Sequence, residues 1–390
     1  MTTKTLKTSD RPIGILARFV PGHSKPLGKQ THLIQGFFNA AISIGRTMAV
    51  FHPDDLLTDS RPHGWFFRDG EWRDARFRLP CVLYDRLYST LSGPDRKMQV
   101  QKRQLETERK IVFMNPMPMA ETATDKLAFG GFLREQKIAS PAIIEKSIPK
   151  PGCLWGHIFE HGSLIIKPRY GRMGKGIMRF SKSNTGVLFH SDTGRLIAEN
   201  PWHLAGMIEA IMRSSGLTHR HFILQECISM PENAPRYFDI RVLVQRISGS
   251  EPARIAGEVA RVGSAGVHVP NIDFGGLAMP LPGWLNRVFG HQATRLHEAL
   301  RETALTVFQC VESTFGKTGE LGLDMLIDGN GKIWVIEANS KPGRIAFERL
   351  ASGFGLDPDA RRDFALQRKN SILNPVVYCA WLMDREGVNS

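Results

Sequence analysis

The sequence predicts a protein of mixed helices and strands, and three features of the chain support this. Strand and helix patterns alternate up to about residue 115, as in a small parallel-sheet domain. From residue 164 onward, apolar runs with the length and composition of strands dominate. A long helical pattern over residues 291–315 then precedes a hairpin that carries acidic residues. We therefore expect an α+β protein that begins with a small α/β part.

The α/β part is predicted from a short series of apolar patterns. They indicate a strand at residues 13–20, a helix at 29–46, and strands at 48–51 and 81–84, with a hairpin around Asp69-Gly70. The segment from Gly22 to Lys29 lies between a strand and a helix N-terminus, which suits an anion, although a mobile surface loop would explain it equally well.

The rest of the chain is predicted to contain strands framed by helices. The sequence Asn115-Pro116-Met117-Pro118 interrupts the pattern before a helix that begins at about Thr124. Strands are predicted at residues 164–167, 177–180, 222–228, 239–247 and 254–261. After the acidic hairpin, a closing helix is predicted at residues 375–384.

The composition suits a folded chain of two or three domains, with 390 residues, 42% hydrophobic and 23% charged. The 51 Lys and Arg exceed the 38 Asp and Glu and give a net charge of +13, which favours an anionic partner such as a nucleotide, an acidic metabolite, nucleic acid or a polyanionic envelope. The densest basic run, residues 96–110, is interleaved with Glu106 and Glu108 and is typical of a solvated helix face. Nucleic acid is therefore the less favoured partner.

Cysteines, histidines and apolar runs limit the remaining classes. The five cysteines are far apart and form no C-x-x-C pair, which predicts neither a zinc site nor a disulfide framework and suits a reducing compartment. None of the 13 histidines has a spacing that we interpret as a ligand set. No apolar run approaches the length of a membrane span, so we expect no transmembrane segment and a cytoplasmic location.

The acidic hairpin, LGLDMLIDGNGKIWVIEANSKPGR at residues 321–344, predicts a cation site. Its two apolar runs flank Asn330-Gly331, a dipeptide typical of the two-residue type I′ turn. With that turn Asp324 lies opposite Glu337, and Asn339 projects from the same face. Facing carboxylates repel unless a cation lies between them, and carboxylate and amide oxygens suit Mg²⁺. An exposed hairpin with ordinary surface charges is the alternative.

A glycine-rich loop in LIIKPRYGRMGKGIMRF predicts a phosphate contact. Lys167 ends a strand before it, and its glycines and cations are Gly171, Arg172, Gly174, Lys175 and Gly176. The loop is not a Walker motif, because Gly176 follows Gly174-Lys175 where Ser or Thr would stand. An ordinary flexible hairpin is the alternative.

Arg241 and Arg261 lie on successive predicted strands and are candidates for clamping a phosphate or carboxylate with two parallel hydrogen bonds. Arginines on exposed strand faces are common, so a structural role stays open for both.

Taken in chain order, these motifs resemble the ATP-grasp superfamily. The elements that match are Lys126, Lys167 with its glycine loop, the segment ILQECI at 223–228, and Asp324 followed by Glu337-x-Asn339. The longer motifs RYFDIRVLVQR, VPNIDFGG, ELGLD and IWVIEANSKPGR resemble the YheC/YheD type of endospore coat-associated proteins. The resemblance implies an α+β ATP-grasp fold in which two α+β subdomains enclose ATP after a pre-grasp domain. The expected parts are residues 1–115, 116–230 with the glycine loop, 231–352 with the metal site, and a helical extension at 353–390.

The resemblance also implies roles for residues around ATP. Lys126, Lys167 and the loop from Gly171 to Gly176 would contact the phosphates, each lysine being otherwise a surface residue. Gln225, Glu226 and the backbone of Cys227 would line the adenine, and Glu232 would contact the ribose. Residues 223–228 would equally suit a core strand.

The remaining implied roles concern Mg²⁺ and the reaction. Asp324, Glu337 and Asn339 would bind Mg²⁺, with Glu337 bridging two ions, and Lys167, Arg241 and Arg261 would act on the transferred phosphoryl group. Asn271, Lys341 and Arg344 would approach the substrate, the last two in a turn like that of D-alanine ligase-like enzymes, with a plain Pro-Gly turn as the alternative. Amino-acid ligases of this superfamily often carry an arginine two positions before the metal aspartate, but Gly322 stands there in this chain.

The implied activity is an ATP- and Mg²⁺-dependent ligase that joins a carboxylate to an amine through an acyl-phosphate, with unknown substrates of the amino-acid or peptide type. The resemblance also implies that this ligase is associated with the spore coat or envelope. The alternatives are an ATP-binding spore-coat protein without ligase turnover, with coat proteins as partners, and an ATP-grasp kinase.

Overall fold

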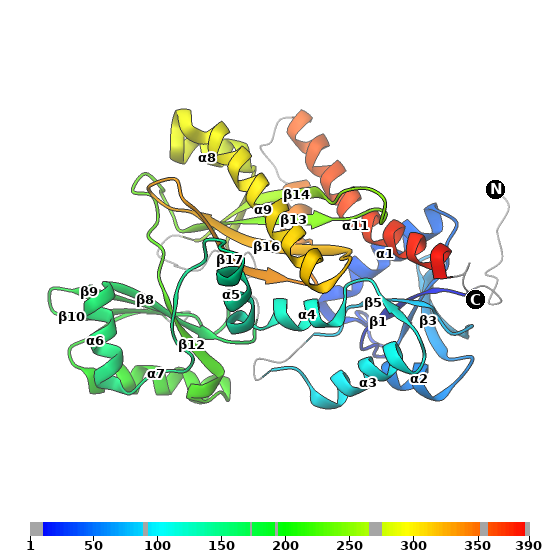
Figure 1. The fold of residues 1–390 in the computed structure, drawn as a ribbon, viewed down its shortest axis with the longest axis horizontal. Coiled ribbons are helices and arrows are strands. Elements are labelled where there is room, and N and C mark those ends of the chain that lie inside the picture. The colour runs from blue at the N-terminus through cyan, green and yellow to red at the C-terminus, as the bar shows by residue number, and fades with distance from the viewer. Residues whose placement is uncertain are drawn as a thin grey trace.

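The computed structural model describes residues 11–88, 93–171, 174–191, 194–264, 275–351 and 358–386, which form three sheets with covering helices. In Figure 1 the first sheet lies at the right, the second at the left and the third between them. Among these residues no helix is both long and apolar enough to cross a membrane. The α+β class predicted from the sequence is confirmed.

The first sheet has the strand order β4-β3-β2-β1-β5-β6, in which β2, β1, β5 and β6 are parallel. Its strands are β1 Ile13–Leu16, β2 Met48–Phe51, β3 His63–Arg68, β4 Glu71–Arg76, β5 Val82–Asp85 and β6 Val112–Phe113, with helices α1 Thr31–Ser43, α2 Pro53–Thr58 and α3 Arg96–Thr107. Strands β1 and β2 are buried throughout, which explains their continuous apolar sequences. Asp69 and Gly70 both have positive φ, 52° and 84°, as the predicted hairpin turn between β3 and β4 requires.

The second sheet is antiparallel, with the order β11-β10-β9-β8-β12-β7. Its strands are β7 Ile143–Glu145, β8 Ser163–Pro168, β9 Met178–Ser183, β10 Gly186–Ser191, β11 Gly194–Ala198 and β12 Phe222–Glu226, and its helices are α6 Pro151–His161 and α7 Pro201–Ser215. Leu154 and Ile158 of α6 and Leu204 and Ile208 of α7 share one apolar core with the sheet. Lys167 stands near the end of β8, opposite Ile223 of β12.

The third sheet has the order β15-β14-β13-β16-β17 and is also antiparallel. Its strands are β13 Phe238–Gln245, β14 Arg254–Val262, β15 Leu277–Met279, β16 Glu320–Ile327 and β17 Ile333–Asn339. Helices α8 Leu281–Phe289 and α9 Ala293–Phe315 cover it. Every residue of β16 is buried, so the carboxylates of Glu320 and Asp324 lie in the interior and must be paired.

Two helices before the second sheet pack on the third. Helices α4 Met117–Thr124 and α5 Lys126–Glu135 place Met119, Phe129 and Leu133 in the core of the third sheet. The domain bounds predicted from the sequence place α4 and α5 in the same part as the glycine loop. The order of elements along the chain does not show which core a helix joins.

The C-terminal helix is longer than predicted. Helix α11 runs over Pro358–Glu386 and contains Pro375, where the sequence predicted its beginning. Its second half contributes Val376 and Tyr378 to the first core, and Phe364 joins a small cluster with Phe347 of α10 Ile345–Ala351. Helix α11 therefore connects the first sheet to the third.

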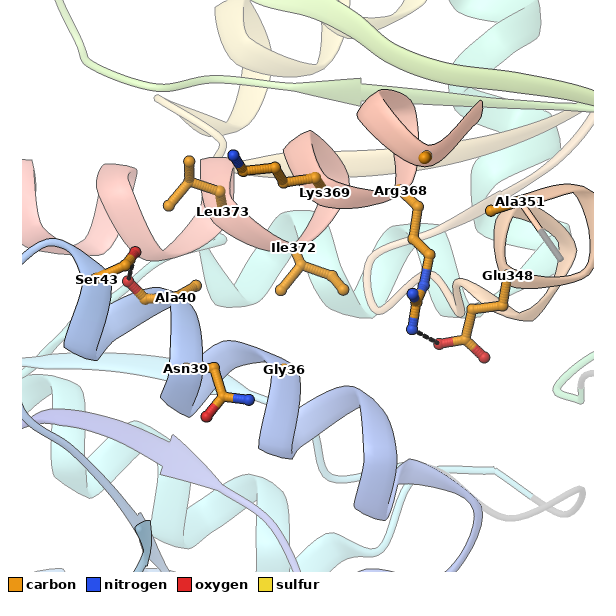
Figure 2. Close-up of a pocket in the computed structure, with 11 residues that line it drawn as sticks. Gly36, Asn39, Ala40, Ser43, Glu348, Ala351, Arg368, Lys369, Ile372 and Leu373 are labelled. Carbon is orange, nitrogen blue, oxygen red and sulfur yellow. Dashed lines mark hydrogen bonds and ion pairs between the residues drawn. The ribbon is translucent and has the colours of Figure 1, made fainter. Parts of the chain in front are cut away.

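A groove of about 500 Å³ lies between α1, α10 and α11 (Figure 2). It is lined by small residues of α1 such as Gly36 and Ala40, and by Arg368 and Glu348, which form an ion pair. None of the residues predicted to bind nucleotide or metal lines it.

Candidate functional site

The β16–β17 hairpin places Asp324 directly opposite Glu337, as predicted. The turn differs from the prediction. The backbone N–H of Gly331 donates to Asp328 O and that of Asp328 donates to Lys332 O, each at 3.0 Å, so three residues form the loop. Gly331 has a positive φ of 78° but Asn330 does not, whereas a type I′ turn requires positive φ at both. A bulge at Ile336 then shifts the register by one residue. The longer loop and the bulge each shift the strand register by one residue, in opposite directions, so Asp324 still lies opposite Glu337.

Asp324 is held by two arginines from the neighbouring strands. Arg241 of β13 is its direct cross-strand partner and donates to both carboxylate oxygens, one of them at 3.0 Å. A guanidinium nitrogen of Arg261 lies 2.9 Å from Asp324 Oδ2. Burial alone would raise the pKa of Asp324, but Arg241 and Arg261 outweigh it and keep the pKa below its ordinary value.

Asp239 orients the second arginine. It faces Arg261 across the β13–β14 pair and accepts two hydrogen bonds from it, at 2.6 and 2.5 Å. Burial raises the pKa of Asp239 to about 6 in spite of this pairing. Asp239, Arg261, Asp324 and Arg241 thus form a row of alternating charge across three strands.

Two lysines lie near Glu337, the carboxylate opposite Asp324. Lys126 Nζ lies 3.6 Å from Glu337 Oε2 and donates to Gly171 O at 2.9 Å. Lys167 is 4% exposed, and burial lowers its pKa to about 8, against the attraction of Glu337. Lys126 and Lys167 come from segments far apart in the chain, and the fold brings both to Glu337.

The glycine loop adopts a backbone that favours glycine. Gly171, Gly174 and Gly176 have φ of 145°, 69° and 72°. Lys175 between them is exposed, and Arg172 lies outside the described residues. Asp125 ties the loop to α5, because it caps that helix and accepts two hydrogen bonds from Arg169. The loop is therefore anchored beside Lys126.

The side chains predicted to line the adenine contact the chain itself. Gln225 donates to Pro141 O at 3.0 Å, and Glu226 accepts from Ala142 N at 3.1 Å. Cys227 is buried, and Glu232 is exposed. The polar pair thus holds residues 141–142 beside β12.

The turn after β17 differs from the predicted substrate contacts. Arg344 is 2% exposed and pairs with the buried Glu320, which also accepts a hydrogen bond from Gln245 at 2.9 Å. Arg344 is therefore directed into the interior in this structure, and its contact with a substrate stays a prediction. Lys341 pairs with Asp85 at the end of β5, at 2.8 Å. Asn271 lies outside the described residues.

The acids meet the chemical requirements of a Mg²⁺ site. Asp324 and Glu337 offer carboxylate oxygens on adjacent strands, and Asn339 lies two residues beyond Glu337 on β17. The Asn339 side-chain nitrogen is buried and has no hydrogen-bond partner among the described residues. This nitrogen is a donor and suits an acceptor such as a phosphate oxygen, whereas the amide oxygen of Asn339 is the atom that would bind Mg²⁺. The three predicted metal residues therefore fit the ion by chemistry.

Sequence reasoning overlooked two residues that build the site. Asn115 accepts from the backbone N–H groups of Gly319 and Glu320 and donates to the carbonyls of Glu320 and Ser340, at 2.9 to 3.0 Å. It therefore clamps the start of β16 to the end of β17. Asp239 was overlooked although it directly precedes Ile240-Arg241, and the acid–x–Arg spacing was the available signal.

Gly322 explains how Arg241 reaches Asp324. A Cβ atom at Gly322 would lie 2.8 Å from Pro342 Cβ and 3.7 Å from Arg241 Cδ. A longer side chain at this position would therefore collide with the turn and with Arg241. The glycine leaves room for the Arg241 side chain to reach Asp324 on the adjacent strand β16.

Comparisons with known proteins agree with this architecture. The family described as YheC/D like ATP-grasp matches residues 118–382. The endospore coat-associated protein YheC of Bacillus subtilis is 21% identical over 309 residues, covering 77% of this chain and 82% of YheC. YheD of the same organism is 25% identical over 291 residues, covering 73% of this chain and 61% of YheD, so the chain spans less than two thirds of that relative.

Solved structures share the fold. A D-alanine–D-alanine ligase from Bacillus anthracis, determined in complex with ATP, superposes with a TM-score of 0.52 at 14% identity, covering 97% of this chain and 100% of the ligase. An N5-carboxyaminoimidazole synthase from Aspergillus clavatus superposes with a TM-score of 0.53 at 12% identity, covering 95% of this chain and 78% of the synthase.

Proposed function

The chain belongs to the YheC/D-like ATP-grasp family, and from this premise we propose that it is an ATP- and Mg²⁺-dependent ligase that joins a carboxylate to an amine. The observation that carries the proposal is the convergence of Lys126 of α5 and Lys167 of the second sheet on Asp324 and Glu337 of the third sheet. A site with two lysines and two carboxylates would bind a polyphosphate and a metal ion together. An ion pair that only stabilises the fold would not need this arrangement.

The basic and the acidic residues of the site would have different roles. Lys126 and Lys167 bind phosphate oxygens, and the loop from Gly171 to Gly176 brings backbone N–H groups to them. Asp324, Glu337 and Asn339 would hold Mg²⁺, which would supply positive charge to offset the negative charge that develops on the transferred phosphoryl group.

Arg241 and Arg261 would orient the reacting carboxylate and the γ-phosphate. A substrate carboxylate oxygen forms a bond to the γ-phosphorus as the bond to ADP breaks, and an amine then displaces inorganic phosphate from the acyl-phosphate. Both arginines bond to Asp324 in this structure. Asp324 would also help to hold Mg²⁺, so Arg241 and Arg261 lie beside the proposed ion site, where their guanidinium N–H groups would donate to phosphate oxygens.

A second proposal concerns location. YheC and YheD are described as endospore coat-associated proteins, and we propose the same association for this chain, with coat proteins as partners. A coat protein that binds ATP without ligase turnover is the competing function. A kinase of the same fold would transfer the phosphoryl group to a hydroxyl instead.

One experiment separates these functions. ADP release is measured over a panel of amino acids and peptides for the native chain, Asp324→Asn, Glu337→Gln and the control Glu298→Gln, an exposed acid on α9. A ligase gives acceptor-stimulated ADP release that the two site variants abolish and the control retains. ATP binding without stimulated release over the whole panel would refute the ligase, and a phosphorylated product stable to hydroxylamine would identify a kinase.

A further inference from the structure

A second cluster of metal-ligating side chains lies on α6, on the outer side of the second sheet. His157, Glu160 and His161 place one ligand atom each within 4.8 Å of the others. Residues three and four apart share one face of a helix, which is why these three side chains converge. No ligand set was predicted among the histidines, although His157-x-x-x-His161 places two imidazoles one helical turn apart.

The two ring nitrogens of His157 face different carboxylates. Nε2 lies 3.5 Å from Glu145 Oε1, and Nδ1 lies 4.0 Å from Glu160 Oε2. Glu145 belongs to β7, so a second element of the fold orients this ring. A carboxylate on one imidazole nitrogen, with the other directed to the ion, is the usual outer arrangement of a metal-binding histidine.

The end of the helix adds to the attraction for a cation. Helix α6 ends at His161, with Gly162 as its C-cap at φ 75°. The last carbonyls of a helix carry partial negative charge, which favours a cation in the final turn. The imidazole planes of His157 and His161 have centroids 6.2 Å apart, near enough for both rings to reach one ion.

We propose that His157, Glu160 and His161 bind a divalent transition-metal ion, with Glu145 positioning His157. Imidazole nitrogens select ions such as Zn²⁺ over Mg²⁺, which prefers oxygen ligands. The cluster is thus chemically distinct from the acidic site at Asp324 and Glu337. The ion would join α6 to β7 through Glu145, and β7 pairs with β12, the strand of Gln225.

The test is a Zn²⁺ titration of the full chain without a polyhistidine tag, in excess Mg²⁺ so that carboxylate sites are occupied. We expect one Zn²⁺ per chain and a rise in the thermal unfolding midpoint. His157→Ala and His161→Ala should each weaken binding about ten-fold or more, whereas His203→Ala, an exposed histidine on α7, should leave it unchanged. Glu145→Gln should weaken it less than either ligand variant does.

Co²⁺ provides an independent readout, because its visible absorption reports nitrogen ligation and should disappear in both histidine variants. Equal Zn²⁺ affinity in the native chain and in both variants would overturn the proposal. Loss of binding in Glu337→Gln but not in His157→Ala would overturn it as well, because it would place the ion in the acidic site. Circular dichroism of each metal-free variant excludes unfolding as the cause of any loss.

Discussion

Replacing Lys167 by Met tests whether the site keeps a buried cation at the expense of stability. Lys167 is 4% exposed, and Met has a similar length without the charge. Glu337 retains Lys126 at 3.6 Å after the change, so the substitution does not leave that carboxylate without a cation. We therefore expect the variant to be more stable than the native chain at pH 7 and to bind ATP more weakly.

The expected magnitude follows from the pKa of Lys167. Burial lowers it to about 8 from an ordinary 10.5, so the unfolded chain binds this proton more tightly than the folded chain does. The free energy of unfolding of the native chain therefore increases as the pH rises from about 8 to 10.5. At roughly 1.4 kcal/mol per pH unit, the charged lysine destabilises the fold by on the order of 3 kcal/mol at neutral pH.

Urea denaturation at neutral and alkaline pH measures both parts of the prediction. Lys167→Met should raise the free energy of unfolding by about 1–3 kcal/mol at pH 7, with the gap narrowing as the pH rises. Its ATP affinity should fall about 10- to 100-fold, the worth of a charge-assisted hydrogen bond. Lys182→Met, at an exposed position on β9, should change stability by less than about 0.5 kcal/mol. A variant that is less stable than the native chain at pH 7, or a gap independent of pH, would refute the reasoning.

Three further substitutions test how the site is built. Gly322→Ala, whose Cβ would lie 2.8 Å from Pro342 Cβ, should lower the free energy of unfolding by about 1–3 kcal/mol and weaken ATP binding, measured by urea denaturation and calorimetry. Glu320→Gln removes the carboxylate that pairs with Arg344 and should destabilise by about 3–5 kcal/mol in the same denaturation assay. Asn115→Ala leaves four backbone groups without its hydrogen bonds and should cost about 2–4 kcal/mol, with increased hydrogen exchange at the first residues of β16.

The hairpin shows how far local sequence reasoning reaches. Asp69-Gly70 and Asn330-Gly331 are both typical of type I′ turns, but only the first forms one. In the second, the Asp328 side chain accepts hydrogen bonds from the backbone N–H groups of Asn330 and Lys332 and from Trp334 Nε1. These contacts stabilise a three-residue loop, and no dipeptide preference could have shown them. The Asp324–Glu337 pairing was predicted correctly because a bulge compensates for the turn.

Long-range pairing explains what the sequence could not show. Arg344 follows a Pro-Gly turn and resembled a substrate contact, but Glu320, 24 positions away, draws it into the interior. Helix α11 begins 17 positions before its predicted start at Pro375. Its two halves pack on different cores, so no single apolar face runs along it from which the sequence could have shown its full length. In both cases the deciding contacts come from residues distant in the chain, Glu320 at the start of β16 for Arg344 and two separate cores for α11.

The cations of the candidate site outnumber its carboxylates by one before any ligand binds, and this excess constrains how the site would work. Four cations, Lys126, Lys167, Arg241 and Arg261, meet three carboxylates, Asp239, Asp324 and Glu337. A nucleotide brings excess negative charge, and a metal on Asp324 must compete with the two arginines already bonded to it. With Mg²⁺ at the proposed site, the metal and the phosphates would favour each other's binding, because a guanidinium group released from Asp324 would be free to donate to a phosphate oxygen. Since coupling of this kind is reciprocal, ATP should raise the affinity for Mg²⁺ by the same factor as Mg²⁺ raises that for ATP, and Arg241→Met should reduce that factor.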